Sequence, residues 1–245
     1  MAPPWIVRRR RGTAAALHAP LTTSSPTLPH PSGSEPPVPA LVVLNEVTGP
    51  ALALGSSQGD DLVRRDVAEA EGVAICRRAS GGGVVALVPS GQLWIDLVLP
   101  RSSPLWDDDI GRSFHWLGAA WARALAARLG PRPCIEVHRG PAVAPDAGRV
   151  VCFAGLGHGE VTVDGRKVVG LSQRRTRTSA RFQCAAVTTW DPDLLHRLLV
   201  PEAVARVGID LAHVAAGLAP GTPSASLEEL GDELVRQLPT PARPR

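Results

Sequence analysis

Lysine is almost missing from this chain of 245 residues. Of its 26 lysine and arginine residues, every one except Lys167 is arginine. Arginine can replace lysine where a solvated positive charge is enough, but not where a compact ammonium with freely rotating donors must approach a small reacting oxygen. The composition therefore makes Lys167 the first candidate for chemistry. The alternative is an ordinary surface lysine retained by chance, and the neighbouring sequence argues against it.

Aromatic residues are also scarce, at 4% with no tyrosine, and the arginines are scattered among acidic residues. The net charge of +3 and the pI near 9.0 raise the question of nucleic acid. Single-stranded nucleic acid is bound on aromatic platforms interleaved with cations, and no such pattern is visible. We therefore predict no nucleic-acid partner.

Long apolar runs are missing too, since none approaches the roughly 20 residues of a membrane-spanning helix. The arginine run at residues 8–11 precedes only a short alanine-rich stretch, which is too weakly apolar for the core of a secretion signal. These features predict a cytoplasmic protein without a membrane partner. The four cysteines lack the close pairs of zinc sites, so we predict no metal site and no disulfide framework; they are Cys76, Cys134, Cys152 and Cys184.

The apolar content of 44% suffices for one good-sized core. Residues 20–39 consist mostly of proline, serine and threonine, and residues 239–245 are similar, so both stretches are predicted to be flexible. We divide the chain into an N-terminal segment, residues 1–39, a folded domain, residues 40–238, and a flexible tail, residues 239–245.

Between these ends, strand and helix patterns alternate. Apolar positions at three- and four-residue spacing predict a long helix that ends near residue 129 and is capped by the acidic residues 107–109. A tight hairpin is expected around Asp164 and Gly165. Strands are predicted at residues 40–44, 51–54, 72–76, 83–88, 93–99, 160–163, 168–171 and 182–189, and weaker helices at 192–199, 201–207 and 226–238. The fold class is therefore α+β, with a mixed sheet flanked by helices.

The sharpest motif is Arg-Arg-Ala-Ser-Gly-Gly-Gly at residues 77–83, between two predicted strands. Consecutive glycines let the backbone approach a ligand and turn successive amides toward one anionic group. Two arginines and a hydroxyl flank them, which suits a phosphate or an acyl-phosphate carbonyl. The motif is neither a Walker loop nor a dinucleotide-binding fingerprint.

The second motif is Gly-Arg-Lys-Val-Val-Gly-Leu-Ser-Gln-Arg-Arg at residues 165–175, which places Lys167 at the exit of the hairpin. Together, and in this order, the two motifs resemble the lipoate-protein ligase A group of the biotin/lipoate ligase superfamily over residues 41–200. Biotin ligases share the fold but carry a Gly-Arg-Gly-Arg type of loop, which this chain lacks.

The resemblance implies a single catalytic domain that forms an acyl-adenylate from lipoate or octanoate with ATP and Mg²⁺. The acyl group would pass to a lysine of a lipoyl carrier domain, in a 2-oxoacid dehydrogenase or in the glycine cleavage H protein. Lys167 would contact the acyl carbonyl and the phosphate. The implied substrate and adenylate site consists of Arg77, Arg78, Ser80, Gly81, Gly82, Gly83 and Gly170.

The chain departs from the family pattern at three points. Residues 84–88 are aliphatic where an aromatic residue and histidine are usual, and residues 183–186 read Gln-Cys-Ala-Ala in place of a His-Gly pair. The chain also has no room for the C-terminal accessory domain of the two-domain ligases, which leaves a separate accessory subunit as a partner to be considered.

Cys152 indicates an alternative function. The Cys152-Phe153 pair, upstream of the lysine segment, is similar to the sequence around the reactive cysteine in the cysteine-dependent octanoyltransferases of the same superfamily. That resemblance implies a thioester on Cys152, loaded from octanoyl-acyl carrier protein, and a nearby Lys167 or arginine could stabilise the thiolate. A buried structural cysteine is the competing interpretation. A non-catalytic acyl or nucleotide sensor is a third hypothesis, and the ligase is favoured because the residue 77–83 loop suits a phosphate.

Overall fold

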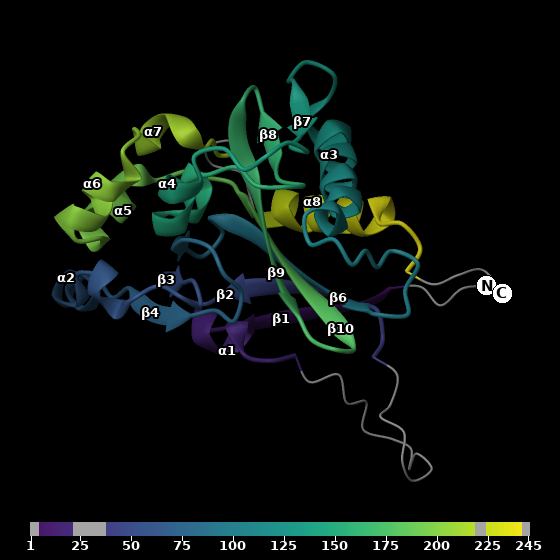
Figure 1. The fold of residues 1–245 in the computed structure, drawn as a ribbon, viewed down its shortest axis with the longest axis horizontal. Helices are drawn as coiled ribbons and strands as arrows, with labels where there is room; N and C mark the ends of the chain where they lie inside the picture. Colours follow the sequence, from purple (N-terminus) through teal and green to yellow (C-terminus); the bar gives the residue numbers. More distant parts are fainter. Residues whose placement is uncertain (1–4, 22–37, 219–223, 242–245) are drawn as a thin grey trace, which may run out of the picture.

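The computed structural model describes residues 5–21, 38–218 and 224–241, and its centre is a mixed seven-stranded sheet in the order β1-β2-β6-β10-β9-β8-β7 (Figure 1). Its first two strands are parallel and its other neighbours antiparallel. The strands are β1 (Ile6–Gly12), β2 (Leu41–Val47), β6 (Gln92–Pro100), β7 (Ile135–Val137), β8 (Val161–Val163), β9 (Arg166–Arg175) and β10 (Ser179–Val187). The predicted α+β class with a mixed sheet is confirmed.

A smaller three-stranded sheet has the order β4-β3-β5, from β3 (Ala51–Leu54), β4 (Ala74–Arg77) and β5 (Val85–Leu87). The glycine loop lies between its second and third strands in sequence. Strand β6 of the large sheet is buried along almost its whole length, because structure covers both of its faces.

Two long helices cover one face of the large sheet, α3 (His115–Leu129) and α8 (Ser224–Gln237) (Figure 1). Their apolar stripes, including Leu117, Trp121 and Leu230, form the main core with β6, β9 and β10. A second core joins the small sheet to the short helices that gather at the other end of the molecule, α2 (Arg65–Ala70), α4 (Pro145–Val150), α5 (Pro192–Leu198), α6 (Pro201–Val207) and α7 (Leu211–Val214).

The predicted cap of the long helix is wrong in position. Asp109 accepts from the backbone N–H of Arg112 at 2.8 Å, and thus caps a 3₁₀ turn, Arg112–Phe114, that precedes α3. The carboxylate of Asp107 accepts two hydrogen bonds from the guanidinium of Arg112. The acidic residues therefore stabilise the segment before the helix and not the first turn of the helix. The hydrogen bonds and the positive charge of Arg112 lower the pKa of both carboxyl groups.

Residues before 40, the boundary predicted for the domain, pack into the same fold. Strand β1 pairs with β2 in parallel, from Ile6 opposite Leu41 to Gly12 opposite Val47. Helix α1 (Ala14–His18) follows, capped by Thr13, and its Ala14 and Leu17 are buried. Most of the proline-rich stretch, residues 22–37, lies outside the described residues.

The tail predicted to be flexible makes ordered contacts where it is described. The indole N–H of Trp5 donates to the carbonyl of Pro239 at 2.9 Å, and the hydroxyl of Ser103 donates to that of Pro241 at 2.6 Å. Both ends of the described chain are therefore attached to the same domain. Within that part of the chain, no helix combines the length and apolar character needed to cross a membrane.

Candidate functional site

Two rows of residues across the sheet build the floor of a cavity. Ala185 on β10 lies opposite Trp94 on β6 and Gly170 on β9, and Gln183 lies opposite Asp96 and Ser172. Residues paired in this way project to the same face. Because Ala185 has a small side chain, the floor leaves space beside Trp94, whereas the Phe153 ring packs over Gly170, 3.1 Å from the position that a Cβ would take there.

The cavity has an empty volume of about 420 Å³, its open mouth included, and a mostly apolar lining. The small sheet and the 3₁₀ turn Cys152–Ala154 form its other walls. Its lining residues are His18, Ala53, Arg78, Val85, Leu87, Trp94, Cys152, Phe153, Gly170, Leu171, Ser172, Gln183, Cys184 and Ala185. Such a shape suits an apolar chain with its reactive end among polar groups.

The glycine loop lies beside this cavity and needs its glycines for different reasons. Gly82 has φ +98°, in the region that favours glycine, and a Cβ on Gly83 would lie 2.5 Å from the carbonyl oxygen of Gly148. Gly81 is exposed, and a Cβ there would meet nothing within 4 Å. The loop therefore packs closely against the α4–Cys152 segment while its outer residue leaves space for a ligand.

The polar side chains of the loop are largely engaged within the protein. Arg77 points away from the cavity, toward the carbonyls of Gly55 and Gln58 and the carboxylate of Asp60. Arg78 is 4% exposed and donates to the carbonyls of Ala53, Gly81 and Gly83. Arg78 thus lines the cavity and holds the loop, whereas Arg77 is outside the candidate site.

Ser80 connects the loop to the floor of the cavity. Its hydroxyl donates to Oε1 of Gln183 at 2.8 Å and accepts from the hydroxyl of Ser172 at 3.1 Å. With Ser80 1% exposed, these contacts fix the register of the loop over β9 and β10. Sequence reasoning placed Ser80 at the site but gave no role to Gln183 or Ser172.

Lys167 is buried behind the part of the cavity wall that Phe153 and Gly170 form, and all three of its donors have partners. Its Nζ lies 2.8 Å from each of the carbonyl oxygens of Cys152 and Gly155, and 2.6 Å from Oε2 of Glu160. The ammonium also lies 5.0 Å from the centroid of the Phe153 ring, and both Phe153 and the neighbouring Gly170 line the cavity. A surface lysine is thereby excluded.

Glu160 is the functional candidate that the sequence analysis missed. The Lys167 and Glu160 side chains are 3% and 6% exposed, and the carboxylate also accepts from the backbone N–H groups of Gly157 and Leu171. A buried ammonium requires such a partner. The sequence held one signal for Glu160. It directly precedes strand β8, and β8 pairs with β9, the strand of Lys167, with Thr162 opposite Lys167.

Cys152 lies beside Phe153 on the cavity wall and is half-buried. Its Sγ would lie 3.8 Å from a Cβ placed on Gly82, so the thiol faces the glycine loop. The other two cysteines nearby are buried, and burial raises the pKa of the Cys76 thiol to about 11 and that of Cys184 still higher. Cys152 is therefore the thiol placed to meet a ligand in this cavity.

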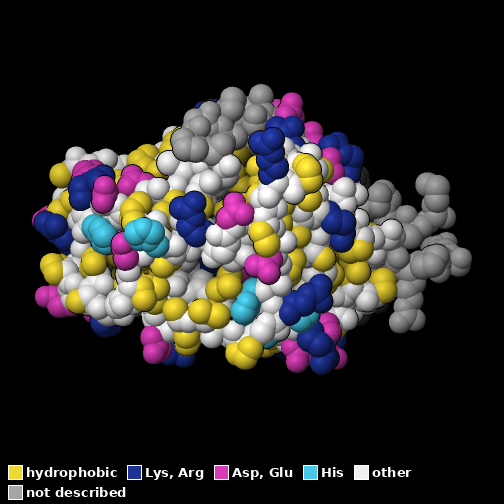
Figure 2. All heavy atoms as spheres, turned by 90° about the horizontal axis from the view of Figure 1, so that it is seen from above, with side chains coloured by type: hydrophobic (Ala, Val, Ile, Leu, Met, Phe, Trp, Pro, Cys, Tyr) yellow, Lys and Arg dark blue, Asp and Glu magenta, His cyan; other side chains and the backbone are white. Residues whose placement is uncertain are grey.

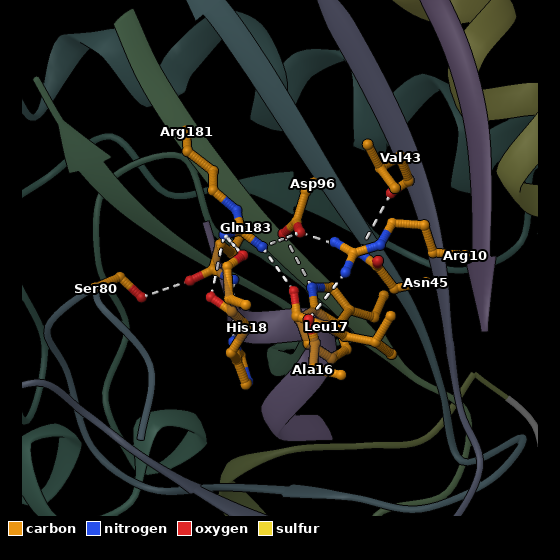
Figure 3. Close-up of polar contacts among 12 residues, drawn as sticks. Arg10, Ala16, Leu17, His18, Val43, Asn45, Ser80, Asp96, Arg181 and Gln183 are labelled. Atoms are coloured by element: carbon orange, nitrogen blue, oxygen red, sulfur yellow. Dashed lines mark hydrogen bonds and ion pairs between the residues drawn. The ribbon is translucent and has the colours of Figure 1, made fainter. Parts of the chain in front are cut away.

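A polar network that includes the N-terminal segment supports the part of the wall that His18 and Trp94 form (Figure 3). Asp96 is fully buried and accepts from Trp94, Asn45 and Arg181, the last at 2.6 Å. The guanidinium of Arg181 also donates to the last carbonyls of α1, those of Leu17, His18 and Ala19. These bonds hold His18 on the cavity wall, with its ring centroid 4.4 Å from that of Trp94.

Burial, assisted by the positive charges of Arg78 and Arg181, lowers the pKa of His18 to about 3. Because this pKa lies below the unfolded value near 6.5, the neutral ring adds stability above pH 6.5, and that stability is lost as the pH falls toward 3. We expect the wild type to lose up to about 1.4 kcal/mol per pH unit in this window relative to His18→Gln. Urea unfolding of both proteins from pH 4 to pH 8 measures the difference, and parallel curves would contradict the prediction.

The four arginines of residues 174–181 are separated by the fold. Arg175 donates to the carbonyls of Asp107 and Asp108, and Arg181 is held by Asp96. Arg174 and Arg177 remain exposed. On the face seen in Figure 2, basic and acidic side chains are interspersed. Within the described residues, no group of three or more histidine, cysteine or acidic side chains is arranged to hold a metal ion.

Three solved structures have a similar fold at low sequence identity. A protein of Thermoplasma acidophilum with bound lipoic acid has a TM-score of 0.60 at 18% identity, over 81% of this chain and 71% of that one. A lipoate-protein ligase A with bound ATP has a TM-score of 0.59 at 19% identity, with the same coverages. The bipartite lipoate protein ligase of T. acidophilum, studied with its E2 lipoyl domain, has a TM-score of 0.59 at 18% identity, covering 81% and 69%.

A search of curated protein sequences gives no match. The family model of the lipoyl protein ligase A/B catalytic domain, in contrast, matches residues 30–236. That range includes the glycine loop, Cys152, Glu160 and Lys167, and the solved neighbours have the same mixed sheet flanked by helices. The chain therefore belongs to the lipoyl protein ligase A/B catalytic-domain family.

Proposed function

We propose that this protein activates lipoate or octanoate as the acyl-adenylate and transfers the acyl group to a lysine of a lipoyl carrier domain. The observation that carries the proposal is an apolar cavity lined by Phe153 and Cys152, with the buried Lys167 directly behind Phe153 and the glycine loop beside Cys152. Trp94 and Ala185, on neighbouring strands of its floor, offer an apolar surface to an acyl chain. Each buried methylene contributes about 0.8 kcal/mol to binding.

The first step joins the acid to the nucleotide. A carboxylate oxygen attacks the α-phosphorus of ATP, and pyrophosphate leaves. Backbone amides at the exposed Gly81 and Gly82 are suited to the phosphate, and the magnesium ion would be carried mainly by the phosphates and water, as is usual for this ion. The ATP-bound ligase of similar fold supports this step.

The second step moves the acyl group. The ε-amine of the carrier lysine attacks the acyl carbon, the bond to the AMP oxygen breaks, and the amine loses a proton. Lys167 can stabilise the oxygens on which charge develops by exchanging its two backbone carbonyl partners for them, while Glu160 retains the ion pair. The T. acidophilum ligase studied with its E2 lipoyl domain supports a carrier domain as the acceptor.

A second candidate function is favoured by the position of Cys152. As a transferase, the protein would accept octanoyl from acyl carrier protein: the Cys152 thiolate attacks the thioester carbonyl, and the carrier thiol leaves. The lysine amine then attacks the new thioester and releases Cys152. This route needs no ATP, and it is consistent with the engagement of several donors of Arg77 and Arg78 by backbone carbonyls within the protein.

One experiment separates the candidates. We expect the purified protein with Mg²⁺ to exchange labelled pyrophosphate into ATP when lipoate or octanoate is added, and Cys152→Ser to keep this exchange within about fivefold. The matched control is Cys134→Ser at an exposed thiol. Absence of exchange, together with octanoyl transfer from carrier protein that Cys152→Ser abolishes, would replace the ligase by the transferase. Ligand binding without either reaction would indicate a sensor.

A further inference from the structure

The side chain of Phe153 separates the ammonium of Lys167 from the acyl cavity. Phe153 lines the cavity and Lys167 does not, and Nζ of Lys167 lies 5.0 Å from the centroid of the Phe153 ring. The two carbonyl groups that accept from Nζ belong to Cys152 and Gly155, on either side of Phe153 in the chain. A hydrogen bond requires a separation of about 2.9 Å. A carbonyl in the cavity therefore cannot contact the ammonium while the ring keeps this position.

A second cavity lies on another side of the Phe153 ring. It has an empty volume of about 610 Å³, its open mouth included, and a mostly apolar lining that includes Val187, Trp190 and Leu194. Phe153 and Val85 line both cavities, so these two side chains form the partition between them. The ring centroids of Phe153 and Trp190 are 5.7 Å apart. A ring that turns toward Trp190 remains in apolar surroundings, so it does not lose its burial by moving.

The backbone on the N-terminal side of Phe153 is anchored, so the side chain is the part that can move. The N–H of Cys152 donates to the carbonyl of Val84 at 3.0 Å, and the N–H of Val84 donates to the carbonyl of Val150 at 2.9 Å. These bonds fix the start of the 3₁₀ turn Cys152–Ala154 beside the glycine loop. A side chain on a fixed backbone changes position by turning between discrete rotamers.

The observed position of the ring suits the protein without a substrate. The ring covers the ammonium of Lys167 on the side of the acyl cavity, within the distance of a cation–π contact. An ammonium that faced an empty apolar cavity would lack a favourable partner on that side. We call this position of the ring closed, because it keeps Lys167 away from the cavity.

We propose that the Phe153 ring is a gate, which turns toward Trp190 when an acyl substrate binds and thereby lets Lys167 contact the acyl carbonyl. The proposal rests on the role given to Lys167 in the proposed function. A ligand shifts an equilibrium between two conformers only if it binds them with different affinity. An acyl carbonyl gains the contact with the ammonium only in the open conformer, so substrate binding favours the open position of Phe153.

The test uses the fact that the chain has one lysine. The full chain labelled with ¹³C-lysine gives one ¹³Cε signal, and the aromatic ring beside Lys167 shifts the attached protons. Octanoate, at concentrations where calorimetry shows binding, is expected to remove this shift in the wild type. Phe153→Leu is expected to lack the shift with and without octanoate. The matched control is Leu194→Ala, which lines only the second cavity and is expected to respond as the wild type does.

Reductive methylation of Lys167 provides a second measurement that needs no acyl ligand. A minor open conformer is typically populated at about 0.1–10%, so Phe153→Leu is expected to raise the methylation rate of Lys167 about tenfold or more, and Phe153→Ala at least as much. Leu194→Ala is expected to keep the rate of the wild type. Circular dichroism and urea unfolding establish that the variants are folded.

Two results would overturn the gate. One is octanoate binding that leaves the Lys167 signal of the wild type unchanged, and the other is an unchanged methylation rate in folded Phe153→Leu and Phe153→Ala. If octanoate does not bind but both variants expose Lys167, the proposed function fails and the closed gate stands. If octanoate does not bind and neither variant exposes Lys167, both fail.

Discussion

Replacing Lys167 with arginine is expected to lower lipoate-dependent acyl transfer about 100-fold to 1,000-fold, the usual effect of removing one well-placed donor from a developing oxyanion. The reason is geometric. The Lys167 side chain is 3% exposed, with partners at 2.6 to 2.8 Å, and a planar guanidinium cannot reproduce three contacts that converge on a compact ammonium. Single-turnover transfer to a lipoyl carrier domain measures the effect.

Folding must be separated from chemistry in this experiment. Lys167→Met leaves the carboxylate of Glu160 buried without its partner, which typically destabilises a protein by about 3 to 5 kcal/mol. The double variant Lys167→Met with Glu160→Gln removes both charges and is expected to recover stability but not activity. Arg166→Met, at the exposed neighbouring residue, is the control. Full turnover by folded Lys167→Arg would refute the role given to the only lysine of the chain.

Ala185→Leu is expected to exclude medium-length chains from the cavity. Ala185 lies between Trp94 and Gly170 on the floor, and its side chain is half-buried toward the cavity, so a larger group enters the space that the chain would occupy. Displacing about four methylenes corresponds to about 3 kcal/mol, or an affinity loss of more than about 100-fold for octanoate.

The length of the acid provides the internal control for this variant. Butyrate does not reach the blocked region, so its weak binding is expected to change less than about threefold in Ala185→Leu. Calorimetry with acids of increasing length measures the profile, and unfolding curves test whether the added volume strains the sheet. An equal loss for butyrate and octanoate would mean that the chain does not lie along the Trp94–Ala185–Gly170 row.

Local patterns predicted the parts of this protein that depend on local chemistry. The hairpin at Asp164–Gly165 forms because both residues adopt positive φ, and the strands on either side pair in antiparallel, with a register shift between Val161 and Thr162. The glycine loop is placed between strands as expected. The long helix was found, but its start was not, because Asp109 caps a 3₁₀ turn whose existence depends on how Arg112 returns to Asp107.

Other parts of the site have no local signal. His18 reaches the cavity across 165 residues of sequence to Gln183, and Arg181 positions it through the carbonyls of α1 and the buried Asp96. A short alanine-rich helix has no sequence pattern that predicts packing beside the cavity, so the predicted domain boundary excluded it. Whether Arg77 or Arg78 faces the ligand was likewise undetermined, since neighbouring residues in extended backbone project in opposite directions.

The sequence by itself determined the family and the α+β class, and it marked the glycine loop and Lys167 as candidates, because these depend on residue types at fixed local spacing. Only the tertiary structure decided that Glu160 neutralises this lysine, that Cys152 faces the loop, and that His18 and Ala185 line the same cavity. The physical reason is that burial and charge pairing are properties of segments brought together by packing, and no single segment carries them.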